Sequence, residues 1–292
     1  MQFPGTALLL GGALLCAATV ATPAAAAVVH SNNPAPGDSF TNPGGTNQGQ
    51  AIGSSGWFYN NTRNGGVVGI SDALPRSGNG SVSFASPSGT AKADIEFLAN
   101  GANFGGNYAA TGSLGSFADL AAMSYDWYRS SASTTAAHLH PSLRVLLDAD
   151  GNLATTGDRG GLVFERAYNG NGTNPVTTDI WLTDLITSQT KLWNFGLGLG
   201  FEYDIDGDGT PYDTLAEWQA GLPNAVILGF SSGVGSGWGG TFIGAVDNIA
   251  WTIGSTTTST NFEVQAVPEP GALALFGLAL AGLAAGTRRR AG

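Results

Sequence analysis

The sequence predicts an all-β protein: a single jelly-roll β-sandwich with two short helices, placed between an N-terminal signal peptide and a C-terminal transmembrane helix. Short runs rich in β-branched and aromatic residues recur along the middle of the chain, as at 67–70, 143–147 and 225–230. Gly, Asn, Asp and Pro separate these runs at the intervals found between the strands of sandwiches. Strands do not alternate with long helical patterns, so the sequence excludes a parallel α/β fold.

The composition is that of a folded, acidic protein, with 42% of its 292 residues hydrophobic and 11% charged. Its 45 Gly and 13 Pro make up about a fifth of the chain, below the share typical of low-complexity sequences. Seven Trp, seven Tyr and 14 Phe exclude a disordered chain, because such chains are poor in aromatic residues. The net charge of −10 opposes binding to a phosphate backbone, so we expect no nucleic-acid partner.

Residues 1–27 have the pattern of a secretory signal peptide. A leucine-rich core is followed by the alanine run at 24–27, and we expect cleavage at the end of that run. No Lys or Arg precedes the core, which is atypical of a signal peptide. The alternative is an uncleaved membrane anchor, but Gly11, Gly12 and Pro23 keep the apolar run short. Cys16 allows a lipoprotein interpretation, but Leu15 stands before it where a small residue is expected. Without the signal, the exported domain has no cysteine and forms no disulfide.

Residues 267–292 form a second targeting segment, built from a short motif, an apolar run at 271–286 and a basic end. The motif is Val267, Pro268, Glu269 and Pro270, and the basic end is Arg288, Arg289 and Arg290. As a helix the apolar run would rise about 24 Å, slightly less than a hydrocarbon core of ~30 Å. Adjacent arginines stay on the cytoplasmic side, so the pattern predicts an inner-membrane anchor with its basic end inside.

This tripartite tail resembles the PEP-CTERM sorting signal of Gram-negative bacteria, which is also labelled an ice-binding-protein C-terminal domain. The resemblance implies that an exosortase, a membrane-embedded transpeptidase-like protease, processes the tail. It also implies a location at the cell surface or outside the cell and an association with exopolysaccharide. An ordinary C-terminal membrane anchor is the alternative.

The sequence between the two targeting segments divides into a β-sandwich ectodomain at 28–253 and a linker at 254–266, which begins with a Ser/Thr-rich stretch. The two predicted helices are 116–123 and 214–220. In the second, Thr214 and Glu217 have the spacing of a capping box, and Gly221 stands where a glycine ends a helix. Residues 192–203 are predicted to form one strand.

Four short blocks, at 125–129, 141–144, 233–238 and 246–248, are similar to blocks in uncharacterised secreted PEP-CTERM proteins. More distantly, they are similar to carbohydrate-binding or lectin-like jelly rolls, in which a glycine-rich hairpin precedes a last strand ending in an Asp-Asn pair. This resemblance implies a lectin-like ectodomain and no particular activity.

A candidate calcium loop begins at residue 204. Carboxylates stand at relative positions 1, 3 and 5, glycine at position 6 and a backbone carbonyl donor at position 7, and Asp213 or Glu217 would complete the shell. Position 12 is leucine and no helix enters the loop, so this is not an EF-hand, and an acidic hairpin turn is the alternative. The predicted ligands of a structural Ca²⁺ are Asp204, Asp206, Asp208, Thr210 and Asp213.

A weaker form of this spacing occurs at Asp148, Asp150 and Asn152. Asp158 or Glu165 could add a further ligand if the chain reverses after this segment. The glycine is misplaced for a calcium loop, so the sequence favours a plain hairpin turn here.

Enzyme chemistry has one candidate. Glu202, Asp204 and Asp206 alternate along the predicted strand, as acids do in the catalytic strand of jelly-roll β-glucanases, which this segment resembles imperfectly. The same acids serve the calcium loop, and the two roles conflict. We therefore expect a non-enzymatic protein, and a glycoside hydrolase on the same fold is the alternative.

Two further groups are candidate ligand sites. His138 and His140 would share one strand face, but without a third ligand a structural role is favoured over a metal pair. Of the seven tryptophans, Trp238 has glycine neighbours and is the one expected to be most exposed, as a sugar-stacking platform would be. The function expected is that of an exported envelope or matrix protein, stiffened by Ca²⁺ and associated with extracellular polysaccharide, and a purely structural matrix protein is a third possibility.

Overall fold

The computed structural model describes residues 26–101 and 110–266. The signal peptide's core, the sorting motif, the apolar run and the basic end therefore lie outside the described residues. Within the described ranges, the structure contains no helix long and apolar enough to cross a membrane.

The first sheet is organised around its longest strand, β15 (Phe242–Ile253). One edge of β15 pairs with β8 (Leu120–Arg129), which in turn pairs with β11 (Trp181–Ile186). Its other edge pairs with two strands in succession. The first half of that edge pairs with β6 (Ser81–Ser86), which is followed in the sheet by β5 (Val67–Ser71) and β2 (Phe40–Thr41). The second half pairs with β16 (Thr256–Gln265), which is followed by β1 (Ala27–Pro34).

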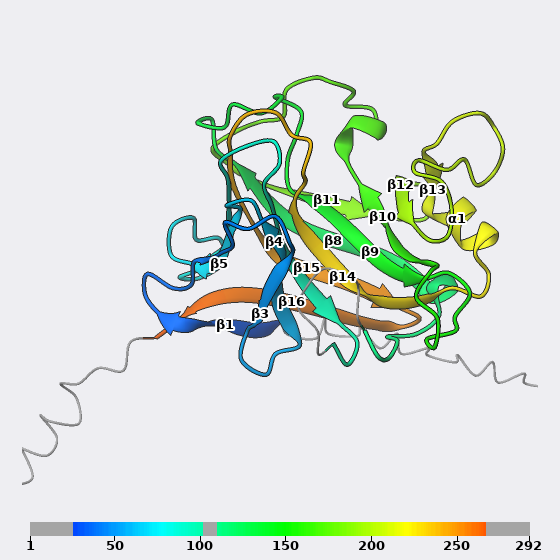
Figure 1. Ribbon diagram of the computed structural model, residues 1–292, viewed down its shortest axis with the longest axis horizontal. Helices are drawn as coiled ribbons and strands as arrows, with labels where there is room; N and C mark the ends of the chain where they lie inside the picture. Colours follow the sequence, from blue (N-terminus) through cyan, green and yellow to red (C-terminus); the bar gives the residue numbers. More distant parts are fainter. Residues whose placement is uncertain (1–25, 102–109, 267–292) are drawn as a thin grey trace, which may run out of the picture.

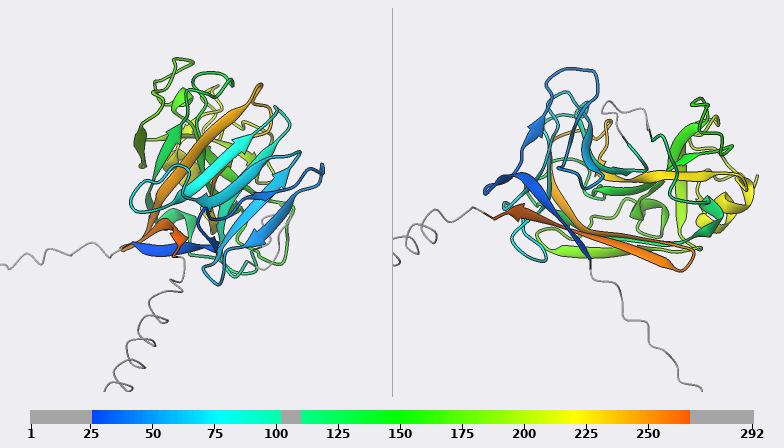
Figure 2. Two further views of the ribbon diagram at one scale, coloured as in Figure 1. Left: turned by 90° about the vertical axis from the view of Figure 1, so that its left-hand side faces the viewer. Right: turned by 90° about the horizontal axis from the view of Figure 1, so that it is seen from below.

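The second sheet is a single row of antiparallel strands. Its order is β13 (Asp213–Thr214), β12 (Lys191–Gly196), β10 (Arg159–Phe164), β9 (Ser142–Asp148), β14 (Val226–Val234), β7 (Lys92–Leu98), β4 (Trp57–Arg63) and β3 (Gln48–Ala51). The two sheets lie face to face (Figures 1 and 2), which confirms the predicted all-β sandwich. A short helix, α1 (Leu215–Gly221), lies at one end of it (Figure 1).

The core lies between the sheets and follows from the period of two along each strand. In β9, Leu143, Val145 and Leu147 are fully buried in the core. Ser142 and Arg144, which alternate with them along β9, point to the other side, the outer face of the second sheet. Burying each large apolar side chain stabilises the fold by roughly 1.5–3 kcal/mol, so this alternation fixes which residues face outward.

One helix prediction is confirmed and the other is wrong. Thr214 caps α1, accepting from the Glu217 amide while the Glu217 carboxylate accepts from the Thr214 amide, although Gly221 is the last helical residue instead of the one after it. The predicted helix at 116–123 is only a 3₁₀ turn, Phe117–Asp119, followed directly by β8. Leu120 and Met123 face the core from β8, so the strand's long-range pairing outweighed local helix propensity.

The predicted linker at 254–266 is wrong. Gly254, with φ of 58°, turns the chain from β15 into β16, which pairs antiparallel with β15 and parallel with β1. Along β16, Thr260, Phe262 and Val264 alternate into the buried interior. The threonines that suggested a flexible linker are β-branched residues that suit a strand, so the sandwich extends to Gln265.

The predicted strand at 192–203 is also too long, because β12 ends at Gly196. Three successive residues, Gly196, Leu197 and Gly198, have positive φ angles of 66°, 64° and 68°. A strand cannot continue through this left-handed backbone. The chain instead forms an irregular loop that reaches the acidic segment at 204.

Candidate functional site

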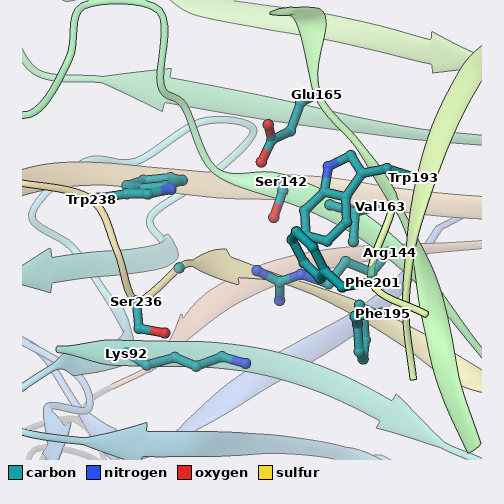
Figure 3. A pocket seen from close by; sticks show the side chains of 11 residues that line it. Lys92, Ser142, Arg144, Val163, Glu165, Trp193, Phe195, Phe201, Ser236 and Trp238 are labelled. Atoms are coloured by element: carbon teal, nitrogen blue, oxygen red, sulfur yellow. The ribbon is translucent and has the colours of Figure 1, made fainter. Parts of the chain in front are cut away.

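A groove of about 260 Å³ lies on the outer face of the second sheet. Strands β7, β9, β10 and β12 form its floor, and the loops after β12 and β14 form its sides. Figure 3 shows its lining, which is Lys92, Ser142, Arg144, Val163, Glu165, Trp193, Phe195, Phe201, Gly235, Ser236 and Trp238.

The strand register places the central floor residues side by side. Val163 of β10 pairs with Arg144 of β9 on one side and with Trp193 of β12 on the other. Residues paired directly across neighbouring strands point to the same face, so an aliphatic, a basic and an aromatic side chain share this part of the outer face.

Aromatic rings form one wall of the groove. The Trp193 ring meets Phe201 edge to face at 5.3 Å between centroids, and Phe195 lies at 6.5 Å. Phe201 is 69% exposed, and the Trp193 indole Nε1 is buried with no hydrogen-bond partner within residues 26–101 and 110–266. Figure 3 shows Trp238 on the opposite side of the hollow. An exposed ring such as that of Phe201 is suited to stacking on the apolar face of a ligand.

Trp238 is not the exposed platform that the sequence predicted. It is only 8% exposed, and its ring packs edge to face against Phe242 at 5.2 Å. The glycine-rich segment around it folds back onto the sandwich, because a large aromatic ring gains more from packing than from exposure. Trp238 nevertheless lines the groove.

The two basic side chains of the groove are both held by one buried carboxylate. Asp94 lies 2.9 Å from the Arg144 guanidinium and 3.2 Å from the Lys92 ammonium. Burial raises the pKa of Asp94, but the charges of Arg144 and Lys92 together outweigh burial and hold that pKa below its usual value. The carboxylate therefore stays ionised and neutralises part of the positive charge beside the groove.

Glu165 is the one carboxylate among the described groove-lining residues. Its carboxylate points toward the hollow from the rim in Figure 3. Burial raises the pKa of Glu165 to about 7, the Arg144 charge opposes this rise, and the Glu202 charge adds to it. Near neutral pH, Glu165 can therefore either donate or accept a hydrogen bond.

A second buried carboxylate, Glu96, lies two residues along β7 from Asp94. It accepts hydrogen bonds from the side-chain amides of Asn60 and Asn61, at 2.6 and 2.7 Å. Burial, and then the Asp94 charge, raises the pKa of Glu96 to about 7. The outer face of β7 thus carries a buried polar network, and the stability of such a network depends on every member having a hydrogen-bond partner.

The structure brings the predicted calcium ligands together. Oxygens of Asp204, Asp206, Asp208 and Asp213 lie within 4.8 Å of one another. Asp204 accepts the amides of Gly207 and Gly209, each at 2.7 Å, and Asp208 accepts the amide and hydroxyl of Thr210. The Gly209 amide above all lowers the pKa of Asp204, whereas burial raises that of Asp213.

Glu217, the other residue proposed to complete that shell, is used elsewhere. Its Oε2 accepts from the amide and the hydroxyl of Thr214, at 2.7 and 2.8 Å, in the capping box of α1. Asp213 is thus the residue that joins the acidic loop. The loop's own amides satisfy many of its carboxylate oxygens, an arrangement that suits both an acidic turn and an ion-binding loop.

The catalytic-strand hypothesis is wrong in its geometry. Glu202, Asp204 and Asp206 do not lie on a strand, and Glu202 has φ of 50° in the loop after β12. Its amide and that of Tyr203 both donate to Asn194. Acids in an irregular loop do not share the face that a strand would give them.

The two histidines are likewise not on a strand. His140 is buried, stacked 4.4 Å from the Trp127 ring, and its Nδ1 lies 3.2 Å from the Tyr125 hydroxyl. Burial lowers the pKa of His140 to about 4, so the imidazole is neutral. His140 is a core residue, as the favoured structural interpretation proposed.

Sequence reasoning missed most of the groove: Lys92, Ser142, Arg144, Val163, Trp193, Phe195 and Phe201 were not identified as site residues. The alternation along each strand predicts that all of these except Phe201, which lies in the loop after β12, face outward. What it does not provide is the order of the strands, which brings residues more than 100 positions apart into one hollow.

Comparison with known families identifies the tail. Residues 266–290 match the model of the PEP-CTERM protein-sorting motif, which confirms the resemblance of Val267–Pro270 and the three arginines. The chain therefore carries an exosortase-type sorting signal, which implies an exported protein processed at the cell envelope. The match covers the tail alone, and comparison with curated proteins finds no match to the sequence.

Among solved structures, three β-sandwich carbohydrate-binding modules are similar to this chain. Two are family 11 modules from Clostridium thermocellum, the first of them from a cellulosomal cellulase. One has 11% identity and a TM-score of 0.35, covering 71% of this chain and 88% of the module. The other is in complex with a β-1,3-1,4-mixed-linked tetrasaccharide and has 14% identity and a TM-score of 0.35, covering 72% and 96%. The third is from a study of promiscuous specificity in β-sandwich carbohydrate-binding modules, with 13% identity, a TM-score of 0.31 and 70% of this chain covered. This chain spans 56% of its length.

Proposed function

We propose that the sandwich is a non-catalytic saccharide-binding domain that holds a neutral polysaccharide in the groove of the second sheet. The observation that carries this proposal is the pairing of an aromatic wall with a polar floor in one hollow, formed by Trp193 and Phe201 above Ser142 and Arg144. The ring faces would stack on the apolar faces of sugar rings, and the polar groups would bind hydroxyls. The sorting tail supports the proposal because it directs the chain to the surface, where exopolysaccharide is found.

The charges around the groove favour a neutral ligand over an anionic one. Lys92 and Arg144 share one carboxylate, Asp94, which neutralises one of their two positive charges within the sheet. Glu165 adds negative charge at the rim whenever it is ionised, and the whole chain carries −10. A uronate-rich polymer would therefore meet net repulsion.

The groove also favours binding over hydrolysis. Glycosidases use two carboxyl groups, about 5–5.5 Å apart when retaining and about 6.5–9.5 Å apart when inverting. Glu165 is the one carboxylate among the described lining residues, and Glu202, whose charge acts on Glu165, is not among them. A glycoside hydrolase remains the alternative function, and it requires the release of reducing sugar ends, which binding alone does not produce.

The acidic loop at 204–213 is proposed to bind Ca²⁺ with a structural role. Four carboxylates gathered within 4.8 Å repel one another, and an ion that accepts six to eight oxygen ligands would relieve that repulsion. Asp204, Asp206, Asp208 and Asp213 would supply carboxylates, and Thr210 a backbone carbonyl. The loop begins soon after Phe201, so the ion would hold one wall of the groove in place.

Affinity electrophoresis of the purified protein tests the function, in gels that contain neutral mixed-linkage β-glucan or anionic alginate. We expect retardation by a neutral glucan and none by alginate. Phe201→Ala should weaken binding about tenfold, which corresponds to about 1.4 kcal/mol. Leu185→Ala is the matched control, because Leu185 is 64% exposed but lies on β11 of the first sheet.

Three outcomes would contradict the proposal. Binding that Phe201→Ala leaves unchanged would place the ligand elsewhere. Tighter retardation by alginate than by any neutral glucan would overturn the charge argument. Release of reducing ends, lost in Glu165→Gln, would show that the groove belongs to an enzyme.

A further inference from the structure

A second acidic cluster lies at the end of β9 farthest from the groove. Ser142 and Arg144, which line the groove, stand at the start of β9, and Asp148 is its last residue. Oxygens of Asp148, Asp150 and Asp158 lie within 4.8 Å of one another. The loop that joins β9 to β10 therefore folds back so that acids from its two ends meet.

Asp148 adds an independent observation, an unsatisfied buried oxygen. The residue is fully buried, and its Oδ1 has no hydrogen-bond partner among the residues that the structure describes. Its Oδ2 lies 3.1 Å from Nε of Arg159. Buried carboxylate oxygens are nearly always paired, so an orphaned one in an acidic cluster points to a missing positive partner.

The one base that forms a salt bridge with these acids in the described structure does not fill that role. Arg159 pairs with Oδ2 of Asp148, and its other nitrogens donate to the carbonyls of Ala110 and Leu153, at 3.0 and 3.1 Å. These contacts hold the guanidinium on the Oδ2 side. Three carboxylates against one guanidinium leave two negative charges in the cluster.

The other two acids each use an oxygen to accept an amide within the loop. Asp158 Oδ2 accepts from the Asp150 amide at 2.9 Å, and Asp150 Oδ1 accepts from the Asn152 amide at 2.7 Å. These bonds orient both carboxylates beside Asp148. The donors of the cluster are all oxygen, which is the ligand type that hard divalent cations select over Zn²⁺.

We propose that Asp148, Asp150 and Asp158 form a second divalent-cation site, which binds Ca²⁺ at the β9–β10 turn. Its position gives it a structural role, because Asp148 is paired with Arg159 of β10 and Val226 of β14. The ion supplies the missing partner of Oδ1 and fastens the ends of three adjacent central strands. The proposal departs from the plain hairpin turn that the sequence favoured at Asp148, Asp150 and Asn152.

Calorimetric titration of the purified, EDTA-treated protein with CaCl₂ tests this site separately from the 204–213 loop. The background is a variant of that loop, Asp204→Asn with Asp206→Asn and Asp208→Asn, which leaves the second cluster intact. We expect this background to retain one saturable Ca²⁺ site and a rise in Tm on adding Ca²⁺. Adding Asp158→Asn should weaken that site about tenfold or more, since affinity depends on ligand charge.

Asp119→Asn in the same background is the control, because Asp119 is an exposed acid of the 3₁₀ turn before β8. It should leave the heat and the Tm shift unchanged. Absence of a saturable site in the background, or a site insensitive to Asp158→Asn, would overturn the proposal. Neither result depends on whether the 204–213 loop binds Ca²⁺ or the groove binds saccharide, since both are measured separately.

Discussion

The ion cluster beside the groove allows a quantitative test of how the second sheet holds buried charge. Asp94 is fully buried between Arg144 and Lys92. Arg144→Met keeps much of the side chain's length and removes its charge, which leaves Asp94 with Lys92 as its charged partner and with the hydrogen bond from the Asn61 amide at 3.1 Å. Removing one partner of a buried pair destabilises a protein by about 3–5 kcal/mol, because the remaining charge stays buried. Since Lys92 remains, we expect a loss of about 3 kcal/mol, at the lower end of this range.

Thermal and denaturant unfolding measure that loss. For a domain of this size, 1 kcal/mol corresponds to about 2–4 °C in Tm, so Arg144→Met should lower Tm by about 6–12 °C. Combining Arg144→Met with Asp94→Asn removes both charges and should recover at least half of the loss. If the double variant is as unstable as the single one, the loss comes from the packing of the arginine stem, and the reasoning from charge is refuted.

Three further predictions concern pH, the helix cap and the tail. Because burial raises the pKa of Glu165 from 4.5 to about 7, its ionised form destabilises the fold above that pH, and stability gains at most about 3 kcal/mol as pH falls from about 8 to 4.5. Glu165→Gln should remove this gain relative to the unmodified protein, and equal pH dependence in the two would contradict the assignment. Thr214→Ala should destabilise by about 1 kcal/mol in denaturant unfolding by removing the cap of α1, whereas Thr256→Ala, at the exposed start of β16, should change less. Mass spectrometry of the protein from its host should show loss of the residues after Pro270, and an intact tail would indicate a plain membrane anchor.

The structural features that could be predicted from the sequence are those formed by residues close together in the chain. The cap of α1 needs only Thr214 and Glu217, three positions apart, and both hydrogen bonds are present. The acidic loop also follows from spacing, because turns at glycine bring Asp204, Asp206 and Asp208 together whatever the rest of the chain does. Such features are local in origin, so one sequence suffices to find them.

Features set by distant pairing were missed or mistaken. The Thr-rich segment of β16 looks like a linker until β15 and β1 are placed beside it, and residues 116–123 look helical until β8 pairs with β15. The groove is the strongest case. Arg144, Val163 and Trp193 are neighbours only through the register of β9, β10 and β12. From composition, Trp193 is one of seven tryptophans with nothing to distinguish it. Only the pairing of β12 with β10 shows that it forms part of the groove's wall.

The loss of the predicted linker changes how the domain relates to its sorting signal. β16 ends at Gln265, and the sorting-motif match begins at residue 266, so no flexible spacer separates the sandwich from the motif. β16 is also held on both sides, by β15 and by β1. A processing enzyme that reaches the motif must therefore work directly beside a folded sheet. The groove lies on the other sheet, away from β16, so a bound polysaccharide would not have to leave for the tail to be cut.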